Sequence, residues 1–212
     1  MLDPVKLVIT NWGKLMGGDE VLDDCSAPVH PHHPEMGKRE FKLGREVWIE
    51  RTDYEETPPK GFFRLFPGNK VRMKYGWVVE CTGATHADDG SVLEVQAKVI
   101  PDTKSGTPGA DAVKVKGNIT WVGVADGVKA EVRLYDRLFA VPHPETGDKD
   151  FLEELNPDSL KVVTAYVEPS LANAKPDEKF QFERHGYFVA DRVDYGSPLT
   201  EGDSQHVFNR VT

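Results

Sequence analysis

The sequence predicts an all-β fold, an antiparallel barrel or a sandwich, and three observations lead to this prediction. Polar residues alternate with β-branched or aromatic residues in many short segments, which is the pattern of half-buried strands. Turn signals separate these segments, at 88–90, 107–109, 126–127 and 147–148. Helical patterns are rare, so we expect less than about a fifth of the chain to be helical, against the usual third.

The predicted elements follow in chain order. Strands are expected at 39–43, 46–50, 70–74, 77–81, 92–99, 118–122, 129–134, 160–167, 180–182, 186–190 and 206–210. One short helix is expected at 148–155, ended before Pro157, and one helical turn at 170–174. Three stretches read as loops: the Pro/His-rich 24–37, the Gly/Pro-rich 101–111 and the polar 194–205.

Bulk composition limits the function. The chain carries 26 Lys and Arg against 35 Asp and Glu, a net charge of −9, so its whole surface is unsuited to non-specific nucleic-acid binding. No run of about 18 apolar residues predicts a membrane span, and the N-terminus does not resemble a signal peptide. The two cysteines, Cys25 and Cys81, make no disulfide framework, and a reducing, cytoplasmic setting is expected.

One segment departs from the acidic background. Residues 57–79 carry five basic side chains and no acidic one, with five aromatic residues interspersed. Such a segment suits single-stranded or looped RNA, whose bases can be stacked while its phosphates are neutralised. Strand alternation would place Lys70, Arg72 and Lys74 on one face, above Val71 and Met73. The alternative interpretation is a half-buried strand pair with a solvated charged face.

A second segment, 179–188, contains Gln181 and Arg184 among Phe180, Phe182, Tyr187 and Phe188. Both polar side chains can form two hydrogen bonds with a base edge. The alternative is a core strand whose Gln and Arg simply face solvent.

Other chemistry is weakly indicated. Cys25, His30, His32 and His33 lack the spacing of a zinc site, and the prolines between them favour an ordinary loop, so no metal is expected. Nucleophile-elbow, phosphate-loop and dinucleotide-binding motifs are absent, and no carboxylate pair stands out, so no catalytic residue is predicted.

Several segments together resemble the C-terminal region of the glutaminyl-tRNA synthetases. They lie in order along the chain: 3–9, 30–31, 34–39, 46–51, 128–139, 180–188 and 207–210. The resemblance implies two antiparallel, six-stranded β-barrels, like those of a ribosomal protein, with the distal barrel inserted into the proximal one. Residues 1–54 and 122–212 would form the proximal barrel, and residues 55–121 the distal barrel.

The resemblance also implies an RNA site. The base-contacting positions of the family carry over to Arg64, Arg72, Lys74, Gln181 and Arg184, and less strongly to Lys60. This chain departs from the family in having Lys74 in place of Arg, which removes a planar fork. Phe63 also stands where a polar residue is expected, and it could replace a polar contact by stacking.

The implied partners are the tRNA(Gln) anticodon loop and a class I catalytic domain on the N-terminal side. The nucleotide motifs of that domain, of the His-Ile-Gly-His and Lys-Met-Ser-Lys types, are absent. We therefore expect a monomeric, inactive, cofactor-free domain of a parent ligase that uses ATP and Mg²⁺.

Three alternatives remain open. The first is the equivalent domain of an archaeal or eukaryotic glutamyl-tRNA synthetase. The second is a stand-alone RNA-binding β-barrel protein. The third is a sandwich-type adhesin or carbohydrate module.

Overall fold

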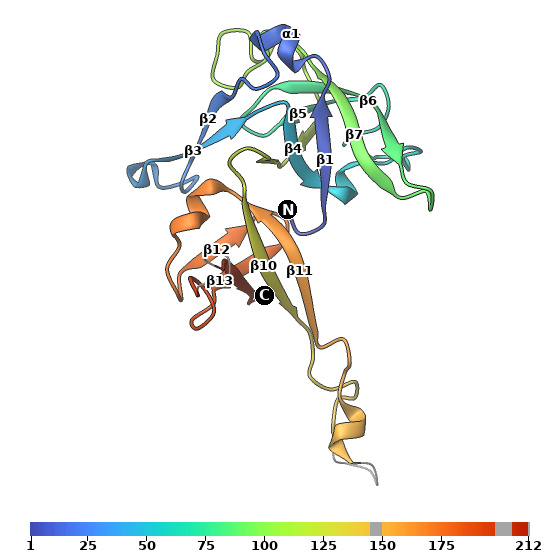
Figure 1. The fold of residues 1–212 in the computed structure, drawn as a ribbon, viewed down its shortest axis with the longest axis vertical. Coiled ribbons are helices and arrows are strands. Elements are labelled where there is room, and N and C mark those ends of the chain that lie inside the picture. Colours follow the sequence, from blue (N-terminus) through green and yellow to red (C-terminus); the bar gives the residue numbers. More distant parts are fainter. Residues whose placement is uncertain (145–149, 198–204, 212) are drawn as a thin grey trace. The chain divides into compact units, whose positions relative to one another are not determined.

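The computed structural model describes residues 1–144, 150–197 and 205–211. Strands account for 41% of the structure and helices for about 10%, and the sheets curl into half-barrels, so the predicted all-β class is confirmed. In the part of the chain that the structure describes, no helix has the length and apolar character needed to span a bilayer. Figure 1 shows the arrangement of the elements.

Except for β1 and β2, the strands closely follow the predicted positions. They are β1 Pro4–Ile9, β2 Asp23–Pro28, β3 Lys38–Leu43, β4 Glu46–Glu50, β5 Lys70–Met73, β6 Val78–His86, β7 Val92–Val99, β8 Gly117–Ile119, β9 Val122–Gly123, β10 Val128–Tyr135, β11 Leu160–Val167, β12 Lys179–Phe182, β13 Gly186–Ala190 and β14 Val207–Arg210. The helices are α1 Trp12–Met16 and the 3₁₀ turns η1 Pro34–Met36, η2 Arg51–Asp53, η3 Phe151–Glu154 and η4 Pro169–Asn173. The predicted strand at 118–122 is divided between β8 and β9.

The chain forms two compact units. Unit 1 contains Met1–Val128 and Tyr166–Ala172, and unit 2 contains Lys129–Ala165 and Asn173–Thr212. The predicted barrel segments do not coincide with these units, because β1 and β4 pair in the same sheet as β5 to β8. The barrel boundaries themselves stay a prediction.

Unit 1 is built on a seven-stranded sheet of order β8-β5-β6-β7-β1-β4-β9. Most neighbours are antiparallel, as expected, but β1 with β7 and β5 with β8 are parallel, which the alternation pattern does not reveal. Its alternate side chains point into one core and are fully buried, among them Leu7, Ile49, Val71, Met73 and Val95.

The prediction of a loop over 24–37 is wrong at its start, because β2 pairs with β3 from Asp23↔Leu43 to Pro28↔Lys38. Cys25 and Ala27 alternate into the core, but they are small residues without the β-branched character that signals a strand. β1 and α1 also went unpredicted, and Trp12 of α1 is completely buried.

The returning segment Tyr166–Ala172 completes unit 1. Tyr166 stacks on Trp48, with ring centroids 4.3 Å apart and planes 10° from parallel. Glu168 accepts a 2.6 Å hydrogen bond from Arg39 Nε. These two contacts fix the segment against β4 and β3.

Unit 2 is built on a five-stranded sheet of order β11-β10-β14-β13-β12, in which β10 and β14 are parallel. Phe188 and Phe208 are completely buried, and Phe182 stacks on Phe188 at 4.2 Å. The short predicted helices appear as η3 and η4, each a single 3₁₀ turn. Parts of two predicted elements, 148–149 and 198–204, lie outside the described residues.

Candidate nucleic-acid interface

The basic segment of unit 1 is anchored by Leu65. This side chain is completely buried, and its backbone N–H and C=O bond with Asp53 O at 2.9 Å and Glu55 N at 3.0 Å. The same residue forms an isolated parallel β-bridge with Tyr54. This anchor holds the loop between Thr57 and Asn69 and leaves its charged side chains at the surface. Lys60 is one of them and is exposed.

Arg64 is oriented by a buried carboxylate. Its Nε lies 3.2 Å from Asp53 Oδ1, and its Nη1 donates to Thr52 O at 3.2 Å. The Asp53 side chain is completely buried, whereas the Arg64 side chain is 38% exposed. A buried carboxylate needs such a partner, so Arg64 supports the fold as well as presenting a guanidinium edge.

Arg72 lies on β5 and is half-buried against the loop at 101–111. Its guanidinium donates to Thr103 O at 2.8 Å, Ala110 O at 2.5 Å and Ser105 Oγ at 3.3 Å. These partners could not be predicted from the sequence, because the loop's acceptors are mainly backbone carbonyls that come together only when the chain folds. Arg72 therefore ties this loop to the sheet.

Lys74 lies in the turn after β5, one residue beyond the strand end. Its Nζ lies 5.5 Å from the ring centroid of Tyr75, which has a positive φ of 61°. The predicted alternation is confirmed along β5: Lys70 is exposed and Arg72 half-buried, while Val71 and Met73 are buried. The strand ends at Met73, so the alternation does not extend to Lys74.

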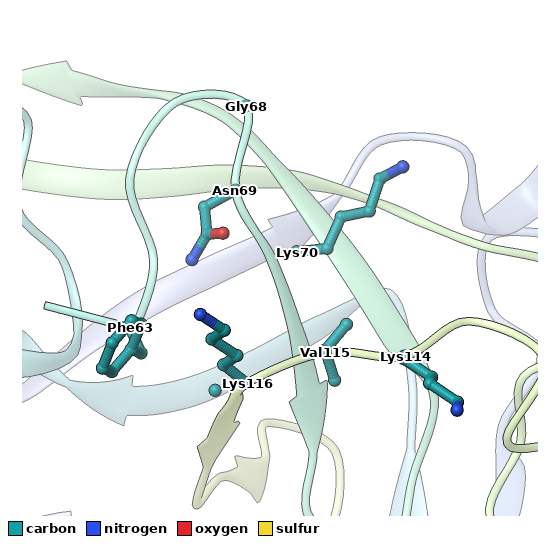
Figure 2. A pocket seen from close by; sticks show the side chains of 8 residues that line it. Phe63, Gly68, Asn69, Lys70, Lys114, Val115 and Lys116 are labelled. Atoms are coloured by element: carbon teal, nitrogen blue, oxygen red, sulfur yellow. The ribbon is translucent and has the colours of Figure 1, made fainter. Parts of the chain in front are cut away.

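The segment is bordered by a pocket of about 360 Å³ (Figure 2). Its lining comprises Phe63, Gly68, Asn69, Lys70, Lys114, Val115, Lys116 and Gly117. Lys114 and Lys116 precede β8 and were not predicted as site residues. Since they lie at least 35 residues beyond the basic segment (57–79), the parallel pairing of β5 with β8 is what brings them there.

In unit 2, Gln181 and Arg184 lie on the hairpin β12–β13. Gln181 is exposed and pairs across the strands with Tyr187, which is 57% exposed. Arg184 is exposed in the turn, with a φ of 70°. Phe182 packs inward on Phe188, so Tyr187 is the ring that shares the outer face with Gln181.

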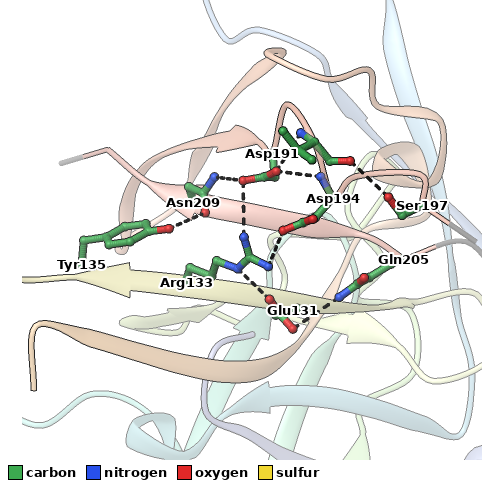
Figure 3. A network of polar contacts seen from close by, with 9 residues as sticks. Glu131, Arg133, Tyr135, Asp191, Asp194, Ser197, Gln205 and Asn209 are labelled. Carbon is green, nitrogen blue, oxygen red and sulfur yellow. Dashed lines mark hydrogen bonds and ion pairs between the residues drawn. The ribbon is translucent and has the colours of Figure 1, made fainter. Parts of the chain in front are cut away.

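The sheet of unit 2 carries one dense ionic cluster (Figure 3). Arg133 contacts Glu131 Oε1 at 2.7 Å, Asp194 Oδ2 at 2.7 Å and Asp191 Oδ2 at 3.5 Å. Asp191 also accepts a 2.6 Å bond from Asn209 Nδ2. These contacts join β10, β14 and the turn after β13.

The remaining candidate groups form no site. Burial raises the pKa of Cys25 to about 12 and that of Cys81 to about 11, so neither thiol is a ready nucleophile. Among the described residues, no three His, Cys, Asp or Glu side chains are grouped to hold a metal ion.

Two family profiles match this chain, both described as anticodon-binding domains of the class I tRNA synthetases (E and Q). One covers residues 1–100 and the other residues 118–191.

Individual relatives agree with these profiles. The chain is 62% identical over 213 residues to a glutamine–tRNA ligase of Ralstonia nicotianae and 63% identical over 213 residues to one of Cupriavidus metallidurans; each alignment covers all of this chain and 34% of the relative. A glutamine–tRNA ligase of Bordetella avium is 60% identical over 194 residues, 92% of this chain and 32% of the relative. The chain thus spans about a third of the length of the curated relatives that it matches.

Proposed function

Since this chain belongs to the anticodon-binding domains of the class I tRNA synthetases for glutamate and glutamine, we propose that it recognises the anticodon loop of tRNA(Gln) for a glutamine–tRNA ligase. The observation that carries the proposal is the whole-length match, at about 60% identity, to relatives that are glutamine–tRNA ligases. These relatives do not favour a glutamyl-tRNA synthetase, a stand-alone RNA-binding barrel or a carbohydrate module.

The exposed hairpin β12–β13 supports base recognition. The Gln181 amide offers a donor and an acceptor to a base edge, and the cross-strand Tyr187 offers an exposed ring on the same face. An unstacked base could therefore be stacked and hydrogen-bonded by neighbouring side chains. Arg184, at the turn, adds a cation at the end of this face.

The basic segment of unit 1 supplies the other contacts. Arg64 is held by Asp53 in one orientation, which suits directional hydrogen bonding to a base. Lys60 and Lys74 are close to point charges and suit phosphates or single acceptors. The Arg72 guanidinium already donates hydrogen bonds to Thr103 O and Ala110 O. In this proposal it contacts a base only through its remaining N–H groups.

The whole ligase would attach glutamine to tRNA(Gln) with ATP and Mg²⁺, through a catalytic domain on the N-terminal side of this chain. In this proposal the chain itself binds no cofactor, acts in the cytoplasm as part of a monomeric enzyme and is inactive alone. The absence of both nucleotide motifs from its sequence supports the last point.

The test is RNA binding by the 212-residue chain. Dissociation constants would be measured for the anticodon stem-loop of tRNA(Gln), for stem-loops with single anticodon swaps, and for an unrelated ribosomal hairpin. We expect each swap to weaken binding by about 1–3 kcal/mol, the usual cost of a wrong base. Equal affinity for all of these RNAs would contradict the proposal.

A further inference from the structure

The pocket of Figure 2 has the chemistry of a nucleotide site. Three lysines, Lys70, Lys114 and Lys116, line it together with Phe63, and no carboxylate belongs to the lining. This concentration of positive charge occurs in a chain of net charge −9. A ring beside several ammonium groups matches a ligand with a stackable base and a phosphate.

Neighbouring segments hold the backbone of Phe63 in place. A Cβ built on Gly117 would lie 1.9 Å from Phe63 O and 2.9 Å from Val71 Cγ1, so β8 touches the Phe63 backbone directly. The carbonyl of the next residue, Arg64, accepts a 2.6 Å hydrogen bond from the side-chain amide of Asn69. The loop is therefore held from both sides, while the Phe63 side chain remains 50% exposed.

Lys116 lies beside this ring, with its Nζ 5.3 Å from the centroid (Figure 2). A cation–π contact at an exposed site is weaker than the stacking of a base on an aromatic side chain. An incoming base can therefore displace the ammonium from the ring. The displaced Lys116 ammonium, on a flexible stem in the same pocket lining, is then available to a phosphate.

The other two lysines differ in their pairing. Lys70 Nζ lies 3.5 Å from Glu80, whose carboxylate offsets part of its charge. Within the described residues, no carboxylate lies within ion-pair distance of Lys114 or Lys116. The uncompensated charge of the pocket therefore comes from the segment before β8.

We propose that this pocket binds one nucleotide of a single-stranded RNA segment, with the base stacked on Phe63 and a phosphate held by Lys114 and Lys116. The inference rests on the proposed function for the source of the RNA. It adds Lys114 and Lys116 to the six residues carried over from the family and places the ring of Phe63 in the same pocket. A purely anionic ligand would leave the exposed ring unused, and an apolar ligand would leave the ammonium groups unpaired.

The direct test is photocrosslinking. The 212-residue chain is irradiated with the tRNA(Gln) anticodon stem-loop carrying 5-iodouridine at single loop positions, and in parallel with an unstructured oligouridine carrying the same label. The crosslinked peptide is then identified by mass spectrometry. We expect a crosslink at Phe63, because this label reacts with a stacked aromatic ring.

Binding measurements on variants give the second readout. Phe63→Leu keeps an apolar side chain and should weaken RNA binding about tenfold, whereas Phe63→Trp should keep the wild-type affinity. Lys114→Ala and Lys116→Ala should each lower the slope of log affinity against log salt by about 0.7. Lys14→Ala, an exposed lysine outside the pocket, is the matched control and should change neither quantity. Circular dichroism checks that each variant is folded.

The outcomes separate the two proposals. Selective binding of the glutamine stem-loop, with no Phe63 crosslink and with unchanged Phe63→Leu affinity, overturns this inference and leaves the proposed function standing. A Phe63 crosslink with equal affinity for every stem-loop supports the pocket and contradicts anticodon recognition. Failure to bind either RNA overturns both.

Discussion

Arg72 and Gln181 differ in how much each side chain contributes to the fold. Arg72 donates at least three hydrogen bonds to the loop at 101–111, whereas Gln181 lies on an exposed strand face. Substitution of Arg72 therefore changes the fold and the RNA surface together. Substitution of Gln181 changes mainly the RNA surface, so it gives the cleaner test of base readout.

We expect Gln181→Ala to reduce discrimination at one anticodon position by about 1–3 kcal/mol, because a bidentate amide contact is directional. Its thermal unfolding should match that of the wild type, since the side chain is exposed. Stem-loop binding with anticodon swaps measures the first quantity and a thermal melt the second. A uniform loss across all anticodons would exclude Gln181 as a base reader.

Asp191 predicts a pH effect. The backbone N–H of Asp194, together with the Asn209 amide, the Val193 N–H and Arg133, holds the pKa of Asp191 below its ordinary value of 3.8. A carboxyl with a lowered folded-state pKa stabilises the fold above its unfolded-state pKa, and this stabilisation is lost as the pH falls through the folded value.

Asp191→Asn should therefore lower the free energy of unfolding at pH 7 by about 1–2 kcal/mol, since charge-assisted hydrogen bonds are lost. The difference from the wild type should shrink as the pH falls below about 3.8. Urea unfolding at several pH values measures it, with the exposed Asp158→Asn as the control. A difference independent of pH would contradict this origin.

Strands that carry a local pattern of alternating residues were predicted, whereas features that depend on pairing with distant segments were not. β4, β7, β11 and β13 have the predicted bounds, because alternating β-branched and aromatic residues mark them. β2 was missed because its buried residues are small. Local pattern also cannot supply the parallel pairing of β5 with β8, since that pairing joins segments distant in the sequence.

The candidate site shows the same limit. Residue types alone indicated the basic segment and the Gln181–Arg184 hairpin, because charge, rings and spacing are visible in the sequence. Lys114 and Lys116 could not be found in this way, since two lysines in a polar loop carry no pattern. Only the sheet topology places them beside Phe63.

The contact of β8 with the basic segment yields a prediction at Gly117. We expect Gly117→Ala to destabilise the chain by about 1–3 kcal/mol, because the new methyl group would overlap Phe63 O. Denaturant unfolding measures the loss. The control is Gly61→Ala, which meets no neighbour within 4 Å and carries only the strain of a positive φ of 89°. If Gly117→Ala kept the wild-type free energy of unfolding, β8 and the Phe63 backbone could move apart at little cost, and the prediction would be wrong.

The basic segment should also govern salt dependence. Lys60→Ala should weaken binding to all anticodon variants equally and lower the slope of log affinity against log salt by about 0.7–0.9, as loss of one phosphate contact does. Gln181→Ala is the matched control, since an uncharged amide releases no counterion. A salt series with both variants decides the point, and identical slopes would remove Lys60 from the phosphate contacts.

For the whole chain, catalysis should be absent. We expect no glutamine-dependent exchange of pyrophosphate into ATP, because neither nucleotide motif of the class I catalytic domain occurs in the sequence. The exchange assay, run beside a full-length glutamine–tRNA ligase as the positive control, measures this. Exchange that disappears on substitution of residues in this chain would contradict the assignment to a binding domain.

The return of the segment Tyr166–Ala172 to unit 1 has a consequence for synthesis on the ribosome. Residues 1–128 emerge before the returning segment, so Trp48 then lacks its stacking partner and Arg39 lacks Glu168. At about 5–20 residues per second, these partners follow roughly 2–9 s later. During this interval the nascent chain holds a nearly complete unit with an uncovered tryptophan, and a stop codon after residue 128 would make that state permanent.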